Sequence, residues 1–479
     1  MSSQISLRDK CGLFGILGDS DAPYLTFQGL HSLQHRGQEG GGIVSGFADG
    51  VLSGSRGMGL VTEHFTEARM ARLKGDRAVG HVRYSTVGAN HRRNVQPLLV
   101  KCALGHLALA HNGTLVNAFE LRRNLEQNGA IFRTEIDTEV LIHLLAKSGR
   151  PAIEDALLDA LPKIDGAFSL LVLCQGKMIA IRDPYGFRPL ELGRMGKVPV
   201  AASETCAFDL IGAERVGQVE PGEMVVFDDG GERTLRYAPA KPSLKRCVFE
   251  LIYLARPDSM VFDRVVHRYR HRCGQLLAQT HPVEADLVMP IPDSGNCAAL
   301  GYADASGIRF TFGFIRNHYI GRTFIQPSQA QRISHLKLKL SPAPQLFEGK
   351  RVVVVDDSIV RGNTSRQIVN VLRQAGAREV HFRSASPPYR FPCYYGVDTP
   401  HAEYLIASEK SIEEVREHLG ADSLGYLSIE QAILAARKEL SSKGEFDVHE
   451  QGFCVACFDG SYPTLGNQAV EKQMLESRR

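Results

Sequence analysis

The stretch of residues 351–365 constrains the fold of this chain more than any other. It opens on four consecutive valines after Arg351, which are β-branched and apolar on both faces of an extended chain. Such a run favours a strand of a parallel sheet that helices cover on both sides. Asp356 and Asp357 follow at its carboxyl end, where open α/β sheets bind their ligands. The stretch therefore predicts an α/β domain with a ligand site after this strand.

A short polar loop and a helix are expected after the two aspartates. The loop contains Gly362, and apolar residues at helical spacing predict a helix that ends at Gly376, with Thr364 and Ser365 as its caps. The amino end of a helix attracts phosphate through unpaired N–H groups and a partial positive charge. The aspartates instead suit sugar hydroxyls or a hydrated Mg²⁺. The expected ligand is a phosphorylated sugar.

This segment resembles the phosphoribosyl pyrophosphate (PRPP) signature of the type I phosphoribosyltransferases, in which a hydrophobic strand and two acids precede a small-residue loop with Gly-x-Thr. The resemblance implies a parallel-sheet phosphoribosyltransferase domain. It assigns PRPP binding to Asp356, Asp357, Ser358, Arg361, Gly362, Thr364 and Ser365. An ordinary strand-turn-helix with acids at the strand end is the alternative.

Length and charge limit the classes of protein that this chain can belong to. With 479 residues it exceeds the usual size of one hydrophobic core, so at least two domains are expected. Its 56 basic and 53 acidic residues leave a net charge of +3, too balanced to indicate a nucleic-acid partner. No apolar run is long enough to cross a bilayer, and residues 1–10 lack the hydrophobic region of a signal peptide. We expect a cytoplasmic protein with small-molecule partners and no membrane association.

Cys11 opens a short apolar run in the first half, and polar motifs follow it along the chain. These motifs are residues 33–39, 80–86, 111–115 and 136–139. Alone, the Cys-Gly pair at 11–12 would more often be core packing. Together, the motifs resemble the glutaminase domain of the N-terminal-nucleophile amidotransferases over residues 11–223. That resemblance implies an αββα fold in which a free N-terminal cysteine attacks the side-chain amide of glutamine and its own α-amine acts as the base.

The same resemblance assigns roles to four further residues. It implies that Arg83 and Asp137 hold the carboxylate and the amine of glutamine, while Asn112 and the N–H of Gly113 receive the oxyanion. An Asn-Gly pair is also typical of a hairpin turn, and the two interpretations are compatible. Because Cys11 must present a free amine, we expect residues 1–10 to be a propeptide.

The chain is expected to divide near a proline-rich stretch at residues 239–242. We expect a propeptide at 1–10, a glutaminase domain at 11–240, a phosphoribosyltransferase domain with an iron–sulfur site at 241–463 and a tail at 464–479. Strand-like runs separated by turns after residue 164 favour an antiparallel sheet in the first domain. Three cysteines in apolar surroundings are expected to be inert core residues. They are Cys102, Cys174 and Cys206.

A second strand-to-loop element occupies residues 286–295, and its small turn is suited to pyrophosphate with Asp293 and Ser294 as candidates. By resemblance, Ser294 joins Asp356 and Asp357 in holding the Mg²⁺ that accompanies PRPP.

The polar residues 316–327, and the basic residues 332–339 after them, resemble the loop that closes over PRPP and excludes water. Arg322, Lys337 and Lys339 would screen the departing pyrophosphate; a solvated basic face is the alternative. The resemblance does not assign contacts to His318 and Asn363, because both residues differ from the commonest sequence of the family at these positions.

Four cysteines in the second half form a candidate metal site: Cys247, Cys393, Cys454 and Cys457. Four thiolates hold either tetrahedral Zn²⁺ or an iron–sulfur cluster, and their spacing does not choose between the two. Residues 246–259, 391–396 and 454–458 resemble the cluster-bearing branch of the glutamine PRPP amidotransferases. That resemblance implies a [4Fe–4S] cluster, with Zn²⁺ as the less favoured occupant, acting as a structural clamp.

The combined resemblance implies one coupled reaction. Glutamine is hydrolysed at Cys11, and ammonia passes internally to C1 of PRPP, giving 5-phosphoribosylamine, glutamate and pyrophosphate in the first step of de novo purine synthesis. It also implies a homotetramer and feedback inhibition by purine nucleotides at the PRPP pocket or a subunit interface. A hexosamine-forming amidotransferase would lack the signature at 352–365, and a PRPP-sensing regulator with a residual glutaminase fold would lack the Cys11 constellation. Both are kept as alternatives.

Overall fold

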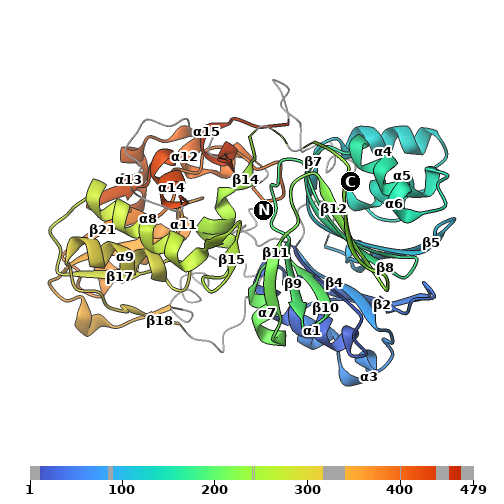
Figure 1. Cartoon of the computed structure of the whole chain (residues 1–479). Helices are drawn as coiled ribbons and strands as arrows, with labels where there is room; N and C mark the ends of the chain where they lie inside the picture. The colour runs from blue at the N-terminus through green and yellow to red at the C-terminus, as the bar shows by residue number, and fades with distance from the viewer. Residues whose placement is uncertain are drawn as a thin grey trace.

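The computed structural model describes residues 11–84, 90–239, 241, 243–316, 340–399, 401–437 and 452–464 (Figure 1). In this part of the chain, the first half builds two stacked sheets whose neighbouring strands are antiparallel. The seven-stranded sheet runs in the order β11 (Glu214–Gln218), β9 (Glu191–Met195), β10 (Val198–Ala202), β1 (Gly12–Leu17), β4 (Arg77–Arg83), β2 (Gly40–Gly46) and β3 (Leu52–Met58). The six-stranded sheet runs β13 (Gly231–Arg236), β12 (Glu223–Asp228), β8 (Lys177–Arg182), β7 (Gly166–Cys174), β6 (Gly105–Leu115) and β5 (Leu98–Cys102).

Helices cover the outer face of each sheet, which gives the αββα layering that was predicted. The seven-stranded sheet packs on α1 (Ala22–Ser32) and α7 (Cys206–Ile211). The six-stranded sheet packs on α4 (Ala118–Gln127), α5 (Thr138–Lys147) and α6 (Ile153–Ala160), which lie together on one side of it in Figure 1. Short helices α2 (Val61–His64) and α3 (Glu67–Met70) follow β3.

Alternation of side chains along β1 explains the layering. Leu13 and Leu17 enter the core between the two sheets, whereas Phe14 and Ile16 enter the core under α1. Successive side chains of a strand point to opposite faces, so a strand that is apolar at every position must be covered on both. The sequence of β1 therefore places it in the middle of the layers rather than at a surface.

The second half contains a four-stranded parallel sheet in the order β17 (Leu287–Pro290), β20 (Arg351–Asp356), β21 (Glu379–Ser384) and β22 (Ser423–Tyr426). Its valines confirm the prediction of a strand buried on both faces. Val353 and Val355 pack toward α8 (Val266–Thr280), α9 (Asn296–Ser306) and α14 (Ile429–Ala435). Val352 and Val354 pack toward α11 (Asn363–Gln374), α12 (Ile406–Glu409) and α13 (Ile412–Leu419).

Smaller elements complete the second half. They are the pairs β14 (Arg246–Cys247) with β23 (Phe453–Cys454), β15 (Met260–Val261) with β16 (Arg264–Val265) and β18 (Phe314–Arg316) with β19 (Leu340–Pro342), a π-helix at Glu250–Leu254, and α15 (Ala456–Asp459). None of the helices in the described residues combines the length and apolar character that crossing a bilayer requires.

The two halves share one hydrophobic core. Ala167 and Phe187 of the first half belong to the same buried cluster as Phe249 and Tyr395 of the second. The rings of Phe187 and Tyr395 stack with their centroids 4.3 Å apart. The contact between the halves is therefore built like the interior of a domain.

One alternative interpretation and one local prediction were wrong. Asn112 and Gly113 do not form a hairpin turn, because they lie within β6 and pair with Ser169 and Phe168 of β7. Thr364 and Ser365 do not cap the helix after the aspartates. That helix, α11, begins at Asn363 with Gly362 as its N-cap, so both hydroxyl residues lie inside the first turn. Its predicted end is confirmed to within two residues.

Candidate active sites

The candidate nucleophile lies at the start of the central strand of the seven-stranded sheet. Cys11 directly precedes β1, which runs between β10 and β4. Its Sγ donates to the carbonyl oxygen of Tyr84 at 3.5 Å, and its own carbonyl oxygen accepts from Nε of Arg36 at 3.1 Å. Hydrogen bonds therefore hold both the side chain and the backbone of Cys11 in place.

Burial raises the pKa of the Cys11 thiol to about 12. The charge of Arg83 and, more weakly, that of Arg36 lower this pKa, whereas the charges of Asp137 and Glu39 raise it. Near neutral pH the sulfur therefore carries its proton. Because the thiolate is the attacking species, a base must accept that proton during the reaction.

Asn112 offers the strongest sign of an oxyanion site. Its side chain is 1% exposed, and its amide Nδ2 has no hydrogen-bond partner among the described residues. An unpaired buried donor costs about 1–3 kcal/mol and calls for an explanation. Gly113 beside it has a φ of 148°, and a Cβ at this position would lie 1.9 Å from the carbonyl oxygen of Ala167. Only glycine fits there.

An anionic and a cationic side chain lie within electrostatic reach of the Cys11 thiol. Asp137, at the N-cap of α5, accepts from the backbone N–H of Leu115 at 2.9 Å. Burial works to raise the pKa of Asp137, yet His111 and these hydrogen bonds hold it below its usual value. Arg83 ends β4 and donates to the carbonyl oxygen of Asn94 at 2.6 Å. Cys11, Arg83 and Asp137 are thus brought within electrostatic reach of one another, as a site for a zwitterionic amino acid requires.

The two predicted acids of the second half are buried together at the carboxyl end of β20. Asp357 accepts hydrogen bonds from the hydroxyls of Ser294 and Ser358, so the structure joins the two strand-to-loop elements. Burial, followed by the charge of Asp357, raises the pKa of Asp356 well above its usual value. Burial also raises the pKa of Asp357. A cation or a set of hydroxyl donors at this pair would relieve both effects.

The loop before α11 is shaped for a close backbone approach. Gly362 has a φ of 73°, and a Cβ there would lie 2.5 Å from Cδ1 of Ile406. Since the N-cap is a glycine, no side-chain capping bond is made to the first turn, where Ser365 lies buried. Arg361 lies over the ring of Tyr404, 4.8 Å from its centroid. The helix terminus is therefore available to an anion.

Some predicted residues lie outside the described part of the chain. They are residues 1–10, His318, Arg322, Lys337 and Lys339. Their proposed roles stay predictions.

The four candidate cysteine ligands converge. Cys247 and Cys454 are direct neighbours across the β14–β23 pair, and Sγ of Cys393 accepts from the backbone N–H of Tyr395 at 3.4 Å. Burial raises the pKa of Cys247 to about 11. Burial also raises the pKa of Cys457 well above its usual value, with Cys393, Cys247 and Cys454 adding to the effect. Even so, no three His, Cys, Asp or Glu side chains among the described residues are gathered closely enough to hold a single metal ion.

The inert-core prediction holds for two of the other cysteines. Cys174 and Cys206 are buried, whereas Cys102 is partly exposed at the end of β5.

Sequence reasoning missed a buried network of charges between the halves. Nη2 of Arg36 donates to both oxygens of Glu250, at 2.9 and 3.0 Å, and Nη1 of Arg36 pairs with Glu204. Nη1 of Arg188 donates to Glu250 at 3.0 Å. All four side chains are fully buried. Arg36 and Glu250 each fall inside a motif quoted above, residues 33–39 and 246–259. The partners lie far apart in the sequence, so no local pattern predicts their pairing.

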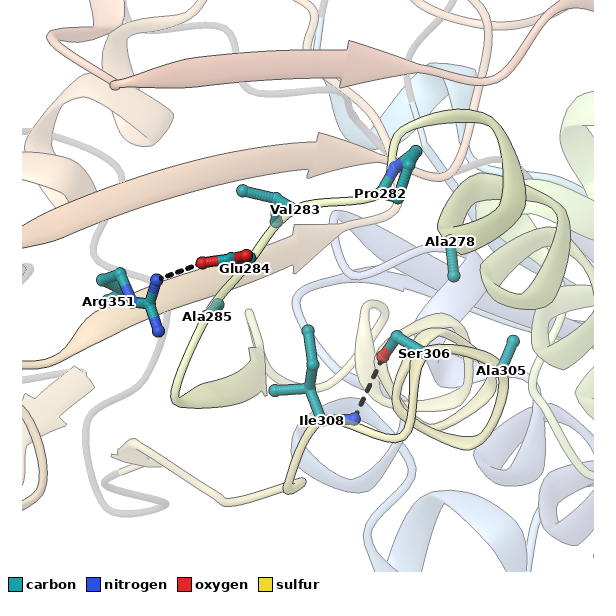
Figure 2. Close-up of a pocket in the computed structure, with 9 residues that line it drawn as sticks. All are labelled: Ala278, Pro282, Val283, Glu284, Ala285, Ala305, Ser306, Ile308 and Arg351. Carbon is teal, nitrogen blue, oxygen red and sulfur yellow. Dashed lines mark hydrogen bonds and ion pairs between the residues drawn. The ribbon is translucent and has the colours of Figure 1, made fainter.

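A hollow of about 460 Å³ lies away from these residues, at the amino-terminal end of the parallel sheet (Figure 2). Figure 2 shows mainly apolar side chains around it, with an ion pair between Arg351 and Glu284 at 3.1 Å. Arg351 begins β20 and Asp356 ends it, so the two are roughly 17 Å apart along an extended strand. The hollow is therefore at the wrong end of the sheet for the acids.

The fold and the two sites together define a glutamine amidotransferase joined to a phosphoribosyltransferase. A family model described as "Glutamine amidotransferase domain" matches residues 81–209. The chain is 49% identical to the amidophosphoribosyltransferase of Bacillus subtilis (strain 168), over 96% of this chain and 95% of that one. The chain belongs to the amidophosphoribosyltransferase family, whose members are enzymes of purine biosynthesis.

Two solved structures agree with this assignment. One, described as the allosteric regulatory enzyme of purine biosynthesis, has a TM-score of 0.90 at 47% identity and covers 96% of this chain and 98% of its own. The other is the glutamine PRPP amidotransferase from B. subtilis in complex with ADP and GMP, with a TM-score of 0.89 at 47% identity, covering 96% of this chain and 99% of its own. The family assignment therefore favours an amidophosphoribosyltransferase over the two alternatives, a hexosamine-forming enzyme and a PRPP-sensing regulator.

Proposed function

We propose that this chain hydrolyses glutamine at Cys11 and delivers the ammonia internally to C1 of PRPP. The observation that carries the glutamine site is the buried amide of Asn112 in β6, a donor without a partner among the described residues. Arg83 and Asp137 bind the carboxylate and the amine of glutamine. Asn112 and the N–H of Gly113 stabilise the oxyanion that forms when sulfur attacks the amide carbon.

The glutamine half-reaction follows from these roles. The α-amine of a mature N-terminal Cys11 accepts the thiol proton as the carbon–sulfur bond forms. The protonated amine then returns this proton to the leaving nitrogen, so that ammonia departs as the amide C–N bond breaks. Water then hydrolyses the thioester to glutamate. Residues 1–10 precede Cys11 in the sequence, so we propose that they are a propeptide that must be removed.

The second half binds PRPP after β20. The amino end of α11, with Gly362, Thr364 and Ser365, holds a phosphate, while Asp356 and Asp357 hold the ribose hydroxyls. The two buried, mutually repelling acids fit Mg²⁺, since this ion is usually held by one or two carboxylates and by substrate phosphates. Bound with Ser294 and the acids, Mg²⁺ would neutralise charge on the pyrophosphate.

The other PRPP contacts fall on Ser358, Arg361, Arg322, Lys337 and Lys339. Arg322, Lys337 and Lys339 belong to the loop that closes over PRPP. Its closure excludes water, builds the ammonia passage and activates the glutaminase. Ammonia attacks C1 as the C1–O bond to pyrophosphate breaks, and pyrophosphate departs with the bonding electrons.

A product assay tests the coupled reaction. Glutamate and pyrophosphate should be released one to one from glutamine and PRPP, and PRPP should stimulate glutamate release. The mass of the active protein should correspond to a chain that begins at Cys11. Equal glutaminase rates with and without PRPP would contradict the coupling, and an active chain that retains Met1 would contradict the propeptide.

Replacing Asn112 by alanine should lower glutamine-dependent turnover by about 10²–10³-fold, because one oxyanion donor is lost. Ammonia-dependent synthesis should stay near that of the wild type. Asn128→Ala, at an exposed helix end, is the control with an equal change in side chain. A loss of less than about threefold in Asn112→Ala would mean that the oxyanion is stabilised elsewhere.

We propose that Cys247, Cys393, Cys454 and Cys457 hold a [4Fe–4S] cluster that clamps residues 452–464 to the start of the second half. A tetrahedral Zn²⁺ with Zn–S bonds of about 2.3 Å needs its sulfurs about 3.8 Å apart. The thiols here are neighbours but are not gathered for a single ion. We favour the cluster because residues 246–259, 391–396 and 454–458 resemble the cluster-bearing branch of this family.

Metal analysis decides between the two occupants. Protein purified without oxygen should contain about four irons and four acid-labile sulfides per chain. Cys457→Ser should lose them, whereas Cys102→Ser should not. One zinc per chain without iron would refute the cluster.

We also propose the domain limits 11–240 and 241–463 with a tail at 464–479, a homotetramer, and inhibition by purine nucleotides. The complex of the B. subtilis enzyme with ADP and GMP supports the last of these. Light scattering that gives the mass of one chain would exclude the tetramer, and activity that is insensitive to AMP and GMP would exclude the inhibition.

A further inference from the structure

One largely buried segment, residues 247–259, is linked to both candidate sites through arginine side chains. Its first turn is a π-helix, Glu250–Leu254, in which the N–H of Ala255 bonds to the carbonyl oxygen of Glu250 at 3.0 Å. Single π-turns are rare and occur often at functional sites. The segment begins at Cys247, and its far end reaches the first half, where the hydroxyl of Ser259 donates to Glu204 at 2.7 Å.

Glu250 reaches the glutamine site by two routes. The first runs through Arg36, which bonds both oxygens of Glu250 and also the carbonyl oxygen of Cys11. The second runs through Arg188, which bonds Glu250 at 3.0 Å and the carbonyl oxygen of Tyr395 at 3.0 Å. Gly396 follows Tyr395, and a Cβ on it would lie 3.1 Å from the carbonyl carbon of Gly113. One carboxylate therefore supports both the nucleophile and the backbone of the oxyanion site.

Charge balance makes Glu250 hard to replace within this network. Two buried cations, Arg36 and Arg188, share two buried anions, Glu204 and Glu250. Losing one anion leaves a buried cation without full compensation, which is a large cost. Aspartate at position 250 keeps the charge but shortens its reach by one methylene.

Arg270 connects the same π-helix to the acids of the second half. It lies on α8 and is 4% exposed. Its Nε donates to the carbonyl oxygen of Leu251 at 2.9 Å and its Nη2 to that of Ala255 at 2.7 Å, so it holds both ends of the turn. Its charge also interacts with Asp357. A ligand bound at Asp357 therefore changes the field at the group that fixes the π-helix.

We propose that the π-helix couples the two active sites: Arg270 senses occupancy at Asp357, and Glu250 is a positioning residue that sets Cys11 through Arg36 and Gly113 through Arg188. This rests on the proposed function, because it gives the route by which PRPP activates the glutaminase. A π-turn can convert to an α-turn by shifting one residue, which rotates the following side chains by about 100°. Such a shift would give the segment a second arrangement, as coupling between sites requires.

The test compares Glu250→Asp and Arg270→Lys with the wild type. Each substitution keeps the charge of the side chain but disrupts the geometry of its hydrogen bonds. The control is Asp258→Asn, an exposed side chain in the same segment whose ion pair with Arg256 faces solvent. Three rates are measured: glutaminase without PRPP, glutaminase with saturating PRPP, and phosphoribosylamine synthesis from ammonia. Thermal unfolding of each variant is followed alongside.

In both variants the PRPP stimulation of the glutaminase, the ratio of its rates with and without PRPP, should be at least tenfold lower than in wild type. The ammonia-dependent rate should stay within about threefold of wild type. In the double variant the losses should not multiply, since residues on one route are not additive. Wild-type stimulation in both single variants overturns the proposal, as do fully multiplicative losses. A parallel fall of all three rates with the unfolding temperature also overturns it, because the network would then act only on stability. A wild type without PRPP stimulation would instead refute the proposed function.

Discussion

Replacing Cys11 with alanine should abolish glutamine-dependent synthesis, by more than about 10⁴-fold, since loss of a covalent nucleophile removes the whole route. Synthesis from ammonium salts should remain close to wild type, because the PRPP site after β20 is built from other elements. Pyrophosphate release measured with each nitrogen source separates the two activities. The variant should be made as a chain that begins at position 11, so that processing does not complicate the result.

The matched control is Cys102→Ala, which removes a partly exposed thiol from β5 of the same half. It should keep both activities. Glutamine-dependent activity that survives in Cys11→Ala would show that another group attacks the amide. Loss of the ammonia-dependent rate as well would show that Cys11 serves the structure of the second site.

Asp356→Asn should have the reciprocal effect. It removes one of the two charges expected to hold Mg²⁺ and the ribose, and such charge stabilisation is worth several kcal/mol, on the order of 10³-fold in rate. Synthesis should fall by that factor with glutamine and with ammonia alike. Glutaminase activity without PRPP should be unchanged, since Cys11, Asn112 and Asp137 lie in the other half.

Stability supplies an independent check on the same variant. The pKa of Asp356 is raised by burial and by the charge of Asp357, so ionised Asp356 destabilises the free protein at neutral pH. Asparagine has the same shape but no charge, so it removes the free-energy cost of the buried carboxylate. The unfolding temperature without ligand should therefore stay level or rise. Asp304→Asn, on an exposed pair with His271, is the control. A lower unfolding temperature would mean that the acids are held by a permanent charge partner.

The sequence predicted best where the structure depends on local pattern. Four valines in a row require cover on both faces, and Val352 and Val353 found it on α11 and α8 respectively. Thr364 and Ser365 were misplaced because Gly362, in the left-handed region, is the N-cap, two residues before Thr364 and three before Ser365. Local rules therefore placed the elements, but not every boundary.

Contacts between distant residues could not be predicted in this way. The Asn112–Gly113 pair has the composition of a turn, and only the long β6–β7 pairing overrides that preference. The bond between Arg36 and Glu250 joins residues 214 positions apart. Charged side chains are expected at the surface unless they are paired, so neither residue signals its own burial.

The core that Ala167 and Phe187 share with the second half limits how this enzyme can be taken apart. Cutting the chain between the halves would expose the ring of Phe187 and its stacking partner Tyr395 to water at once. An excised glutaminase would thus expose an apolar patch and tend to aggregate. Exchanging either half for one from another amidotransferase would require redesign of both new surfaces, so the two halves are expected to be inherited as a unit.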